Sequence, residues 1–155
     1  MIPAGSPAPD ATVFIAPKKP VRLSELFAGT TAVLLFFPLA FSSTCTEEMC
    51  TMAGDLGTYA SLGASVFGIS VDSPYVNARF ARETGATFPI LSDFNREAMQ
   101  AFDIVRVVNG LEGVSERAVF VIRNGIVHYA WVGEHPGVMP SFDAIQEALR
   151  SIRAD

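Results

Sequence analysis

The length and charge of the chain indicate one acidic domain with a substantial core. The chain has 155 residues, half of them hydrophobic, and a formal net charge of −5 at pH 7. A chain of this size can bury a core without metal ions or disulfide bonds, so we expect a single domain over residues 1–155. The acidic balance, with no basic cluster beyond Lys18 and Lys19, argues against a nucleic-acid partner.

The N-terminal segment and the apolar pattern argue against secretion and membrane insertion. Residues 1–9 have neither the basic start nor the apolar core of a signal peptide. The longest apolar stretch is much shorter than the ~20 residues that span a bilayer. The two cysteines, Cys45 and Cys50, are too few and too close for the disulfide framework of a secreted domain. We therefore expect a soluble, cytoplasmic protein with no membrane partner.

The apolar residues alternate between strand-like and helix-like patterns along the chain. The continuous apolar run at 31–37 predicts a strand buried on both faces. From Thr44 to about Gly63 the apolar residues recur at intervals of three and four, as in a helix. In chain order the predicted elements are a strand at 11–15, a helical turn at 24–27, a strand at 31–37, a helix from 44 to about 63, a strand at 65–71, a helix opened by 72–74 and ended at 85, a strand at 88–91, a helix at 95–102, strands at 117–123 and 126–132, and a helix at 141–153.

Two turn signals support this order of elements. Asp72-Ser73-Pro74 places a proline in the first turn of a helix, and Asn124-Gly125 is typical of the turn in a β-hairpin. No repeat, linker or low-complexity segment interrupts the pattern. The alternation of strands and helices, closed by a hairpin and a last helix, predicts an α/β sandwich.

Cys45 stands at a junction that favours nucleophilic chemistry. It follows the apolar strand at the start of the next predicted helix. Unpaired backbone N–H groups and the positive end of the helix dipole favour a thiolate there. A cysteine considered without its context is more often a buried apolar residue, so the position alone only nominates Cys45.

The segment from Phe36 to Cys45 resembles the active-site signature of the peroxiredoxins, which runs Pro, three residues, Thr or Ser, two residues, Cys. Further blocks match the family in the same order and cover most of the chain: Glu48, 68–73, 87–93 and 116–122. Pro38-Leu39-Ala40-Phe41 is similar to the alkyl hydroperoxide reductase E type. A second cysteine five positions after the first is similar to the bacterioferritin-comigratory, or Q, type. The resemblance implies an α/β, thioredoxin-like fold with a central mixed β-sheet flanked by helices.

The resemblance also implies a reaction and a set of roles. A thiol-dependent peroxidase of this kind reduces hydrogen peroxide and small organic hydroperoxides and needs neither a cofactor nor a metal. Cys45 would be the attacking thiolate, with Arg117 as the cation beside it and Ser42 as a hydrogen-bonding partner of the peroxide. The backbone N–H groups of Thr44 and Cys45 would complete the anion site, and Pro38 would shield the thiolate from water.

Several of these residues have simpler interpretations. Ser42 is equally well explained as a helix N-cap, and it lacks the methyl group of the more frequent Thr. Arg117, without the resemblance, would be a solvated charge at a strand edge. Glu48 either orients Arg117 or favours the first helical turn through the dipole.

The aromatic residues near the motif are more typical of a core than of a substrate pocket. Phe36, Phe37 and Phe120 fall on predicted strands, and Phe41 follows directly after one. Among them Phe41 is the best candidate for a residue that lines the pocket.

The role of Cys50 determines how oxidised Cys45 is returned to the thiol. Residues five apart in a regular helix have Cα atoms ~8.7 Å apart, whereas a disulfide needs less than about 7 Å. If Cys50 forms a disulfide with Cys45, the first helical turns must unwind, which Thr46 and Thr51 make easier. We favour this intramolecular disulfide because of the resemblance to the Q type and the lack of any other cysteine. The alternative is that Cys50 is a buried bystander and an external thiol reacts with oxidised Cys45.

Other functions and partners remain to be compared with this hypothesis. His128 and His135, with the two cysteines, are too few for a structural zinc site. A thiol-disulfide oxidoreductase usually has two residues between its cysteines, and here there are four. A non-catalytic redox sensor on the same fold is a further alternative. The expected partners are a peroxide and a thioredoxin-like or other thiol reductant, and a homodimer formed by edge loops is compatible with the sequence.

Overall fold

The computed structural model describes residues 1–154, and its centre is a mixed β-sheet of seven strands. Counting a separate two-stranded pair, the described strands in chain order are β1 (Thr12–Ala16), β2 (Lys19–Arg22), β3 (Thr31–Phe36), β4 (Ala64–Ser70), β5 (Ile90–Ser92), β6 (Val105–Val108), β7 (Leu111–Ser115), β8 (Ala118–Arg123) and β9 (Ile126–Val132). The helices are α1 (Leu23–Phe27), α2 (Ser43–Gly54), α3 (Leu56–Ser61), α4 (Pro74–Thr84), α5 (Glu97–Ala101) and α6 (Phe142–Ala154). The large sheet has the order β2-β1-β5-β4-β3-β8-β9, and β6 and β7 form a separate pair.

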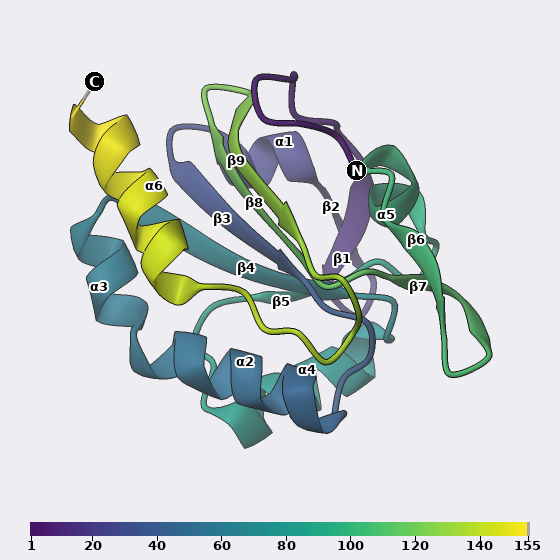
Figure 1. Ribbon diagram of the computed structural model, residues 1–155. Helices are drawn as coiled ribbons and strands as arrows, with labels where there is room; N and C mark the ends of the chain where they lie inside the picture. Colours follow the sequence, from purple (N-terminus) through teal and green to yellow (C-terminus); the bar gives the residue numbers. More distant parts are fainter. Residues whose placement is uncertain (155) are drawn as a thin grey trace.

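Helices cover both faces of this sheet (Figure 1). Side chains of α2, α3, α4 and α6 belong to one hydrophobic cluster, and those of α1 and α5 belong to the other. Along β3, Leu34 and Phe36 pack in the α1 and α5 cluster, whereas Val33 and Leu35 pack in the opposite one. The predicted central strand, buried on both faces, is therefore confirmed, as is the mixed sheet flanked by helices.

The pairing of β3 with its neighbours determines which loop residues meet at one end of the sheet. β3 runs parallel to β4 and antiparallel to β8, with Phe36 opposite Ala118. The segment that leaves β3 and the residue that precedes β8 therefore meet at the same end of the sheet. Cys45 and Arg117 occupy those two positions in the sequence.

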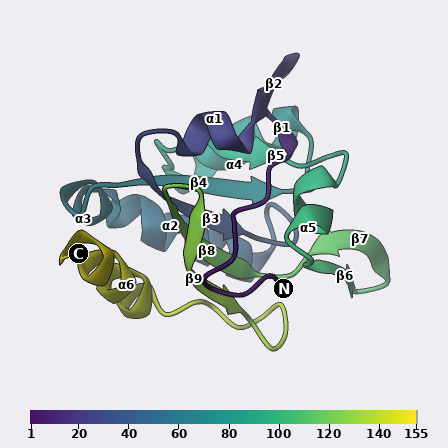
Figure 2. The same ribbon diagram turned by 90° about the horizontal axis from the view of Figure 1, so that it is seen from above.

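Two short pairings were not among the predicted elements. β2 is an edge strand that pairs with β1. Its Pro20 and its charged residues have low strand propensity, so the sequence does not predict it. The β6–β7 hairpin turns at Asn109 and Gly110, whose φ angles are 52° and 78°. An Asn-Gly pair is a strong hairpin signal, but Gly113 within β7 interrupts the apolar alternation. Figure 2 shows this hairpin beside α5, on the side of the molecule opposite α6.

The long helix predicted from Thr44 to about Gly63 is wrong in one respect, because it is two helices. α2 ends at Gly54, and Asp55, with φ −102° and ψ 6°, separates it from α3. Gly54 and Gly57 flank this break and lower the helix propensity on both sides of it. Among residues 1–154, no helix combines the length and apolar character that crossing a membrane requires.

Candidate active site

Cys45 lies in the first turn of α2 and is fully buried. Ser42 precedes the helix, and its carbonyl accepts the first intrahelical hydrogen bond, from the N–H of Thr46 at 2.9 Å. The N–H groups of Ser43, Thr44 and Cys45 come before that bond and have no intrahelical acceptor. The positive end of the helix therefore lies at the cysteine.

Arg117 brings a buried cation to this cysteine. It stands one residue before β8, rather than within the strand as predicted. Its Nη2 donates to Sγ of Cys45 at 3.1 Å, and its Nη1 donates to Oε1 of Glu48 at 2.8 Å. The side chains of Arg117 and Glu48 are only 1% and 0% exposed, so the interpretation of Arg117 as a solvated edge charge is wrong.

A backbone carbonyl completes the partners of the guanidinium. The carbonyl oxygen of Pro136, in the loop between β9 and α6, accepts from Nε of Arg117 at 3.0 Å and from Nη2 at 2.9 Å. Figure 1 shows this loop passing close to the start of α2. The guanidinium of Arg117 is thus held in one orientation by a thiol, a carboxylate and a carbonyl.

Glu48 is fully buried, and its carboxyl group has only part of its hydrogen-bonding capacity satisfied among the described residues. Burial raises the pKa of Glu48 to about 7, although the adjacent charge of Arg117 opposes the shift. Only one of its oxygens meets Arg117, and the buried Oε2 has no hydrogen-bond partner among the described residues. Its contact with Arg117 agrees with the interpretation that Glu48 orients this arginine.

A cavity of about 170 Å³ opens beside these groups. A water molecule takes up ~30 Å³ in the liquid, so the cavity can admit a small peroxide. It is lined by Pro38, Leu39, Ser42, Ser43, Thr44, Val108, Asn109, Arg117, Pro136 and Gly137. Sequence reasoning placed Pro38, Ser42, Thr44 and Arg117 here, but missed the residues of the β6–β7 turn and of the Pro136 loop.

The loop that carries Pro38 and Ser42 is tied down by hydrogen bonds. The Ser42 hydroxyl donates to the Leu39 carbonyl at 2.9 Å and makes no capping bond to the helix, so Ser42 is an N-cap by position only. Oδ2 of Asp72 accepts from the N–H of Ala40 at 2.7 Å. Pro38 is buried and lines the cavity.

Phe41 does not line the cavity, contrary to its selection as the best aromatic candidate. It has a left-handed backbone with φ 68°, and its side chain is 52% exposed. This conformation turns the ring toward α4, where it packs on Phe80 with ring centroids 5.1 Å apart. Phe36, Phe37 and Phe120 are fully buried core residues, as predicted.

Cys50 is exposed, which corrects the alternative that it is a buried bystander. It lies in the same unbroken helix as Cys45, and both thiols are free. Five residues of regular helix keep their Cα atoms ~8.7 Å apart, so this conformation cannot contain a disulfide between them.

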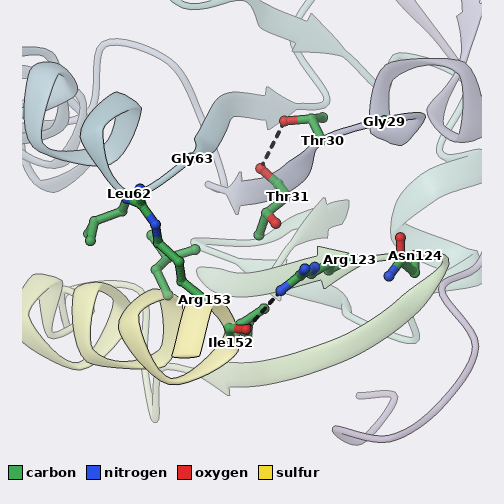
Figure 3. Close-up of a pocket in the computed structure, with 10 residues that line it drawn as sticks. Gly29, Thr30, Thr31, Leu62, Gly63, Arg123, Asn124, Ile152 and Arg153 are labelled. Atoms are coloured by element: carbon green, nitrogen blue, oxygen red, sulfur yellow. Dashed lines mark hydrogen bonds between the residues drawn. The ribbon is translucent and has the colours of Figure 1, made fainter. Parts of the chain in front are cut away.

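A larger cavity, of about 400 Å³, lies where β3 and β4 begin and β8 ends, at the opposite end of the sheet from Cys45. Figure 3 shows the residues that line it. Its charged residues already serve a structural purpose. Nη1 of Arg123 donates to the Ile152 carbonyl at 2.8 Å near the end of α6, and Arg153 donates to the Ser61 carbonyl at the end of α3. Both arginines therefore satisfy carbonyl groups at helix C-termini. Neither Cys45 nor Cys50 lines this cavity.

Comparison with known proteins agrees with this geometry. The family model described as AhpC/TSA family matches residues 4–130. Alkyl hydroperoxide reductase E of Mycobacterium tuberculosis is 31% identical over 157 residues, which cover 99% of this chain and 100% of the relative. The crystal structure of peroxidoxin BcpB from Mycobacterium tuberculosis superposes with a TM-score of 0.83 at 29% identity, covering 99% of this chain and 98% of the other.

A second similar structure was solved with hydrogen peroxide bound. Reduced Prx3 from Vibrio vulnificus in complex with hydrogen peroxide superposes with a TM-score of 0.84 at 26% identity, covering 96% of this chain and 99% of the other. The family match spans well over half of the chain and includes Cys45 and Arg117. The chain therefore belongs to the AhpC/TSA family and is a peroxiredoxin, a thiol-dependent peroxidase with a thioredoxin-like fold.

Proposed function

We propose that Cys45 is the peroxidatic cysteine of this enzyme. The observation that carries the proposal is the 3.1 Å contact between Nη2 of Arg117 and Sγ of Cys45, buried at the start of a helix. In this reaction the thiolate sulfur attacks one oxygen of the peroxide and the O–O bond breaks. Cys45 becomes a sulfenic acid, and the second oxygen leaves as hydroxide or alkoxide and takes up a proton.

The groups around the sulfur would stabilise this step. Negative charge grows on the leaving oxygen, and preorganised donors aimed at that charge lower the barrier. Arg117 and the free N–H groups of Thr44 and Cys45 supply such donors. The Ser42 hydroxyl lines the same cavity and can exchange its bond to the Leu39 carbonyl for one to the peroxide.

We further propose that Cys50 resolves the sulfenic acid. The Cys50 thiolate would attack the oxidised sulfur of Cys45, forming the S–S bond and releasing hydroxide, which takes up a proton to become water. The start of α2 must unwind for this step. Exposure of Cys50 and the end of α2 at Gly54 support this rearrangement. A thioredoxin-like dithiol would then reduce the disulfide and return both thiols.

A second candidate is a one-cysteine reaction in which an external thiol attacks oxidised Cys45 directly. The unbroken helix between Cys45 and Cys50 favours it, because no unwinding is then needed. Mass spectrometry of the protein after one equivalent of hydrogen peroxide separates the two. The Cys50 mechanism predicts a loss of two mass units and a peptide linked through both cysteines. A gain of sixteen mass units, as a sulfenic acid that persists on Cys45, would instead support the external thiol.

A further inference from the structure

The peptide group between Pro136 and Gly137 is hydrogen-bonded at both of its ends. Its carbonyl accepts two bonds from Arg117, at 3.0 Å from Nε and 2.9 Å from Nη2. Its N–H, which belongs to Gly137, donates to Nδ1 of His135 at 3.2 Å. Because a peptide group is planar and its C=O and N–H point in opposite directions, a bond at one end fixes the direction of the other.

This peptide is the centre of a tight turn. The N–H of Val138 donates to the His135 carbonyl at 3.1 Å, so residues His135 to Val138 form a β-turn with Pro136 and Gly137 in the middle. A Pro-Gly pair favours the type II turn, in which the glycine has a positive φ. Among residues 1–154 seven glycines have positive φ, and Gly137 is not one of them.

The turn therefore holds its central peptide against its intrinsic preference. Conversion to a type II turn rotates the central peptide by roughly half a turn. That rotation would point the Pro136 carbonyl away from Arg117 and the Gly137 N–H away from His135. Both ends of the peptide oppose this change.

The side chain of His135 packs directly on the glycine. A Cβ atom at Gly137 would lie 3.2 Å from both Nδ1 and Cε1 of the imidazole. The backbone carbonyl of Arg117 also accepts a hydrogen bond from the N–H of Gly133, at 3.0 Å. The loop from Gly133 to Gly137 is therefore hydrogen-bonded to both the backbone and the guanidinium of Arg117.

We infer that His135 is a positioning residue for the peroxidase reaction. By accepting from the Gly137 N–H, its imidazole keeps the Pro136 carbonyl directed at Arg117, which in turn contacts Cys45. This inference rests on the functions proposed for Arg117 and Cys45. His135 itself does not touch the sulfur, and its side chain is exposed.

The test compares His135→Ala with His135→Asn in the full chain. An Asn side-chain oxygen can accept from the N–H two residues later, as in an Asx-turn, whereas Ala cannot. The readout is the second-order rate constant for oxidation by hydrogen peroxide, measured by competition with a chromogenic peroxidase. His128→Ala is the matched control because His128 lies on β9, away from the turn. Thermal unfolding of each variant checks that the fold is intact.

We expect His135→Ala to react about fivefold more slowly, the factor that corresponds to one net hydrogen bond. His135→Asn should recover most of the rate, and His128→Ala should match the wild type. A wild-type rate in His135→Ala, or an equal loss in His135→Asn, would overturn the inference. Cys45→Ser in the same assay tests the proposed function independently. Peroxidase activity in that variant would reject Cys45, whatever the His135 variants do.

Discussion

Nη2 of Arg117 lies 3.1 Å from Sγ of Cys45, although the two residues are 72 positions apart in the sequence. The antiparallel pairing of β3 with β8 places Phe36 opposite Ala118 and so brings both residues to one end of the sheet. Neither residue lies within a strand, so their contact depends on the register in which β3 and β8 pair. The reactive pair is therefore a product of sheet topology rather than of local sequence.

The first prediction concerns the nucleophile. Cys45→Ser should lose peroxidase turnover, because a serine hydroxyl in the same place is not ionised and cannot form a sulfenic acid. The measurement is consumption of hydrogen peroxide with a dithiol reductant at low peroxide concentration. Turnover at the wild-type rate in this variant would place the reaction elsewhere in the chain.

The second prediction concerns the cation. Arg117→Ala should slow attack on the peroxide by at least about tenfold, equal to about 1.4 kcal/mol of transition-state stabilisation. Arg117→Lys should recover only part of the rate, because one ammonium cannot contact Cys45, Glu48 and the Pro136 carbonyl in the same fixed geometry. The second-order rate constant for peroxide oxidation measures both effects.

A surface arginine provides the control for this pair. The side chain of Arg79 on α4 is 64% exposed, and its one ion pair among residues 1–154 is with Glu83 in its own helix, so Arg79→Ala should react like the wild type. If Arg117→Ala keeps the wild-type rate constant, the contact with Cys45 makes no contribution to catalysis.

How far the site could be predicted depended on which atoms build it. Cys45, Ser42 and Pro38 lie close together in one motif, so their sequence positions sufficed. The Pro136 carbonyl gave no signal, because every residue has a backbone carbonyl and only the fold decides which one meets Arg117. Phe41 was misplaced because its left-handed backbone sends the ring to Phe80, and a bulky residue rarely adopts that conformation.

The fold divides in a similar way. Long apolar strands such as β3 were predicted because burial on both faces leaves a continuous run in the sequence. The β6–β7 hairpin was missed although it contributes Val108 and Asn109 to the cavity. Half-exposed short strands have mixed composition, and tertiary contacts decide their pairing.

The third prediction concerns the buried carboxylate. Burial raises the pKa of Glu48 from its usual 4.5 to about 7, so between these two pH values the folded protein binds more protons than the unfolded chain. Glu48 therefore favours the folded state at low pH, and this contribution is lost as pH rises from about 4.5 through about 7. Glu48→Gln removes the titration but keeps an oxygen for Nη1 of Arg117.

Urea unfolding at several pH values tests this directly. The free energy of unfolding of the wild type, minus that of Glu48→Gln, should fall as pH rises from 4.5 to 7. Taking the difference removes the contribution of Asp93, whose pKa burial raises to about 6 and which is present in both proteins. A difference that stays constant or increases with pH would show that the pair with Arg117 outweighs the burial of Glu48.

The last prediction joins the spacing of the two cysteines to the dynamics of α2. Cα atoms ~8.7 Å apart in a helix must approach to less than about 7 Å in a disulfide, so oxidation by one equivalent of peroxide should unwind the first part of α2. Amide exchange from Thr44 to about Gly54 should then be faster than in the reduced protein. Cys50→Ser should keep the slow exchange, retain a sulfenic acid on Cys45 that a dimedone reagent can trap, and over-oxidise more readily. Unchanged exchange in the oxidised wild type, with two unlinked sulfurs, would mean that an external thiol completes the cycle.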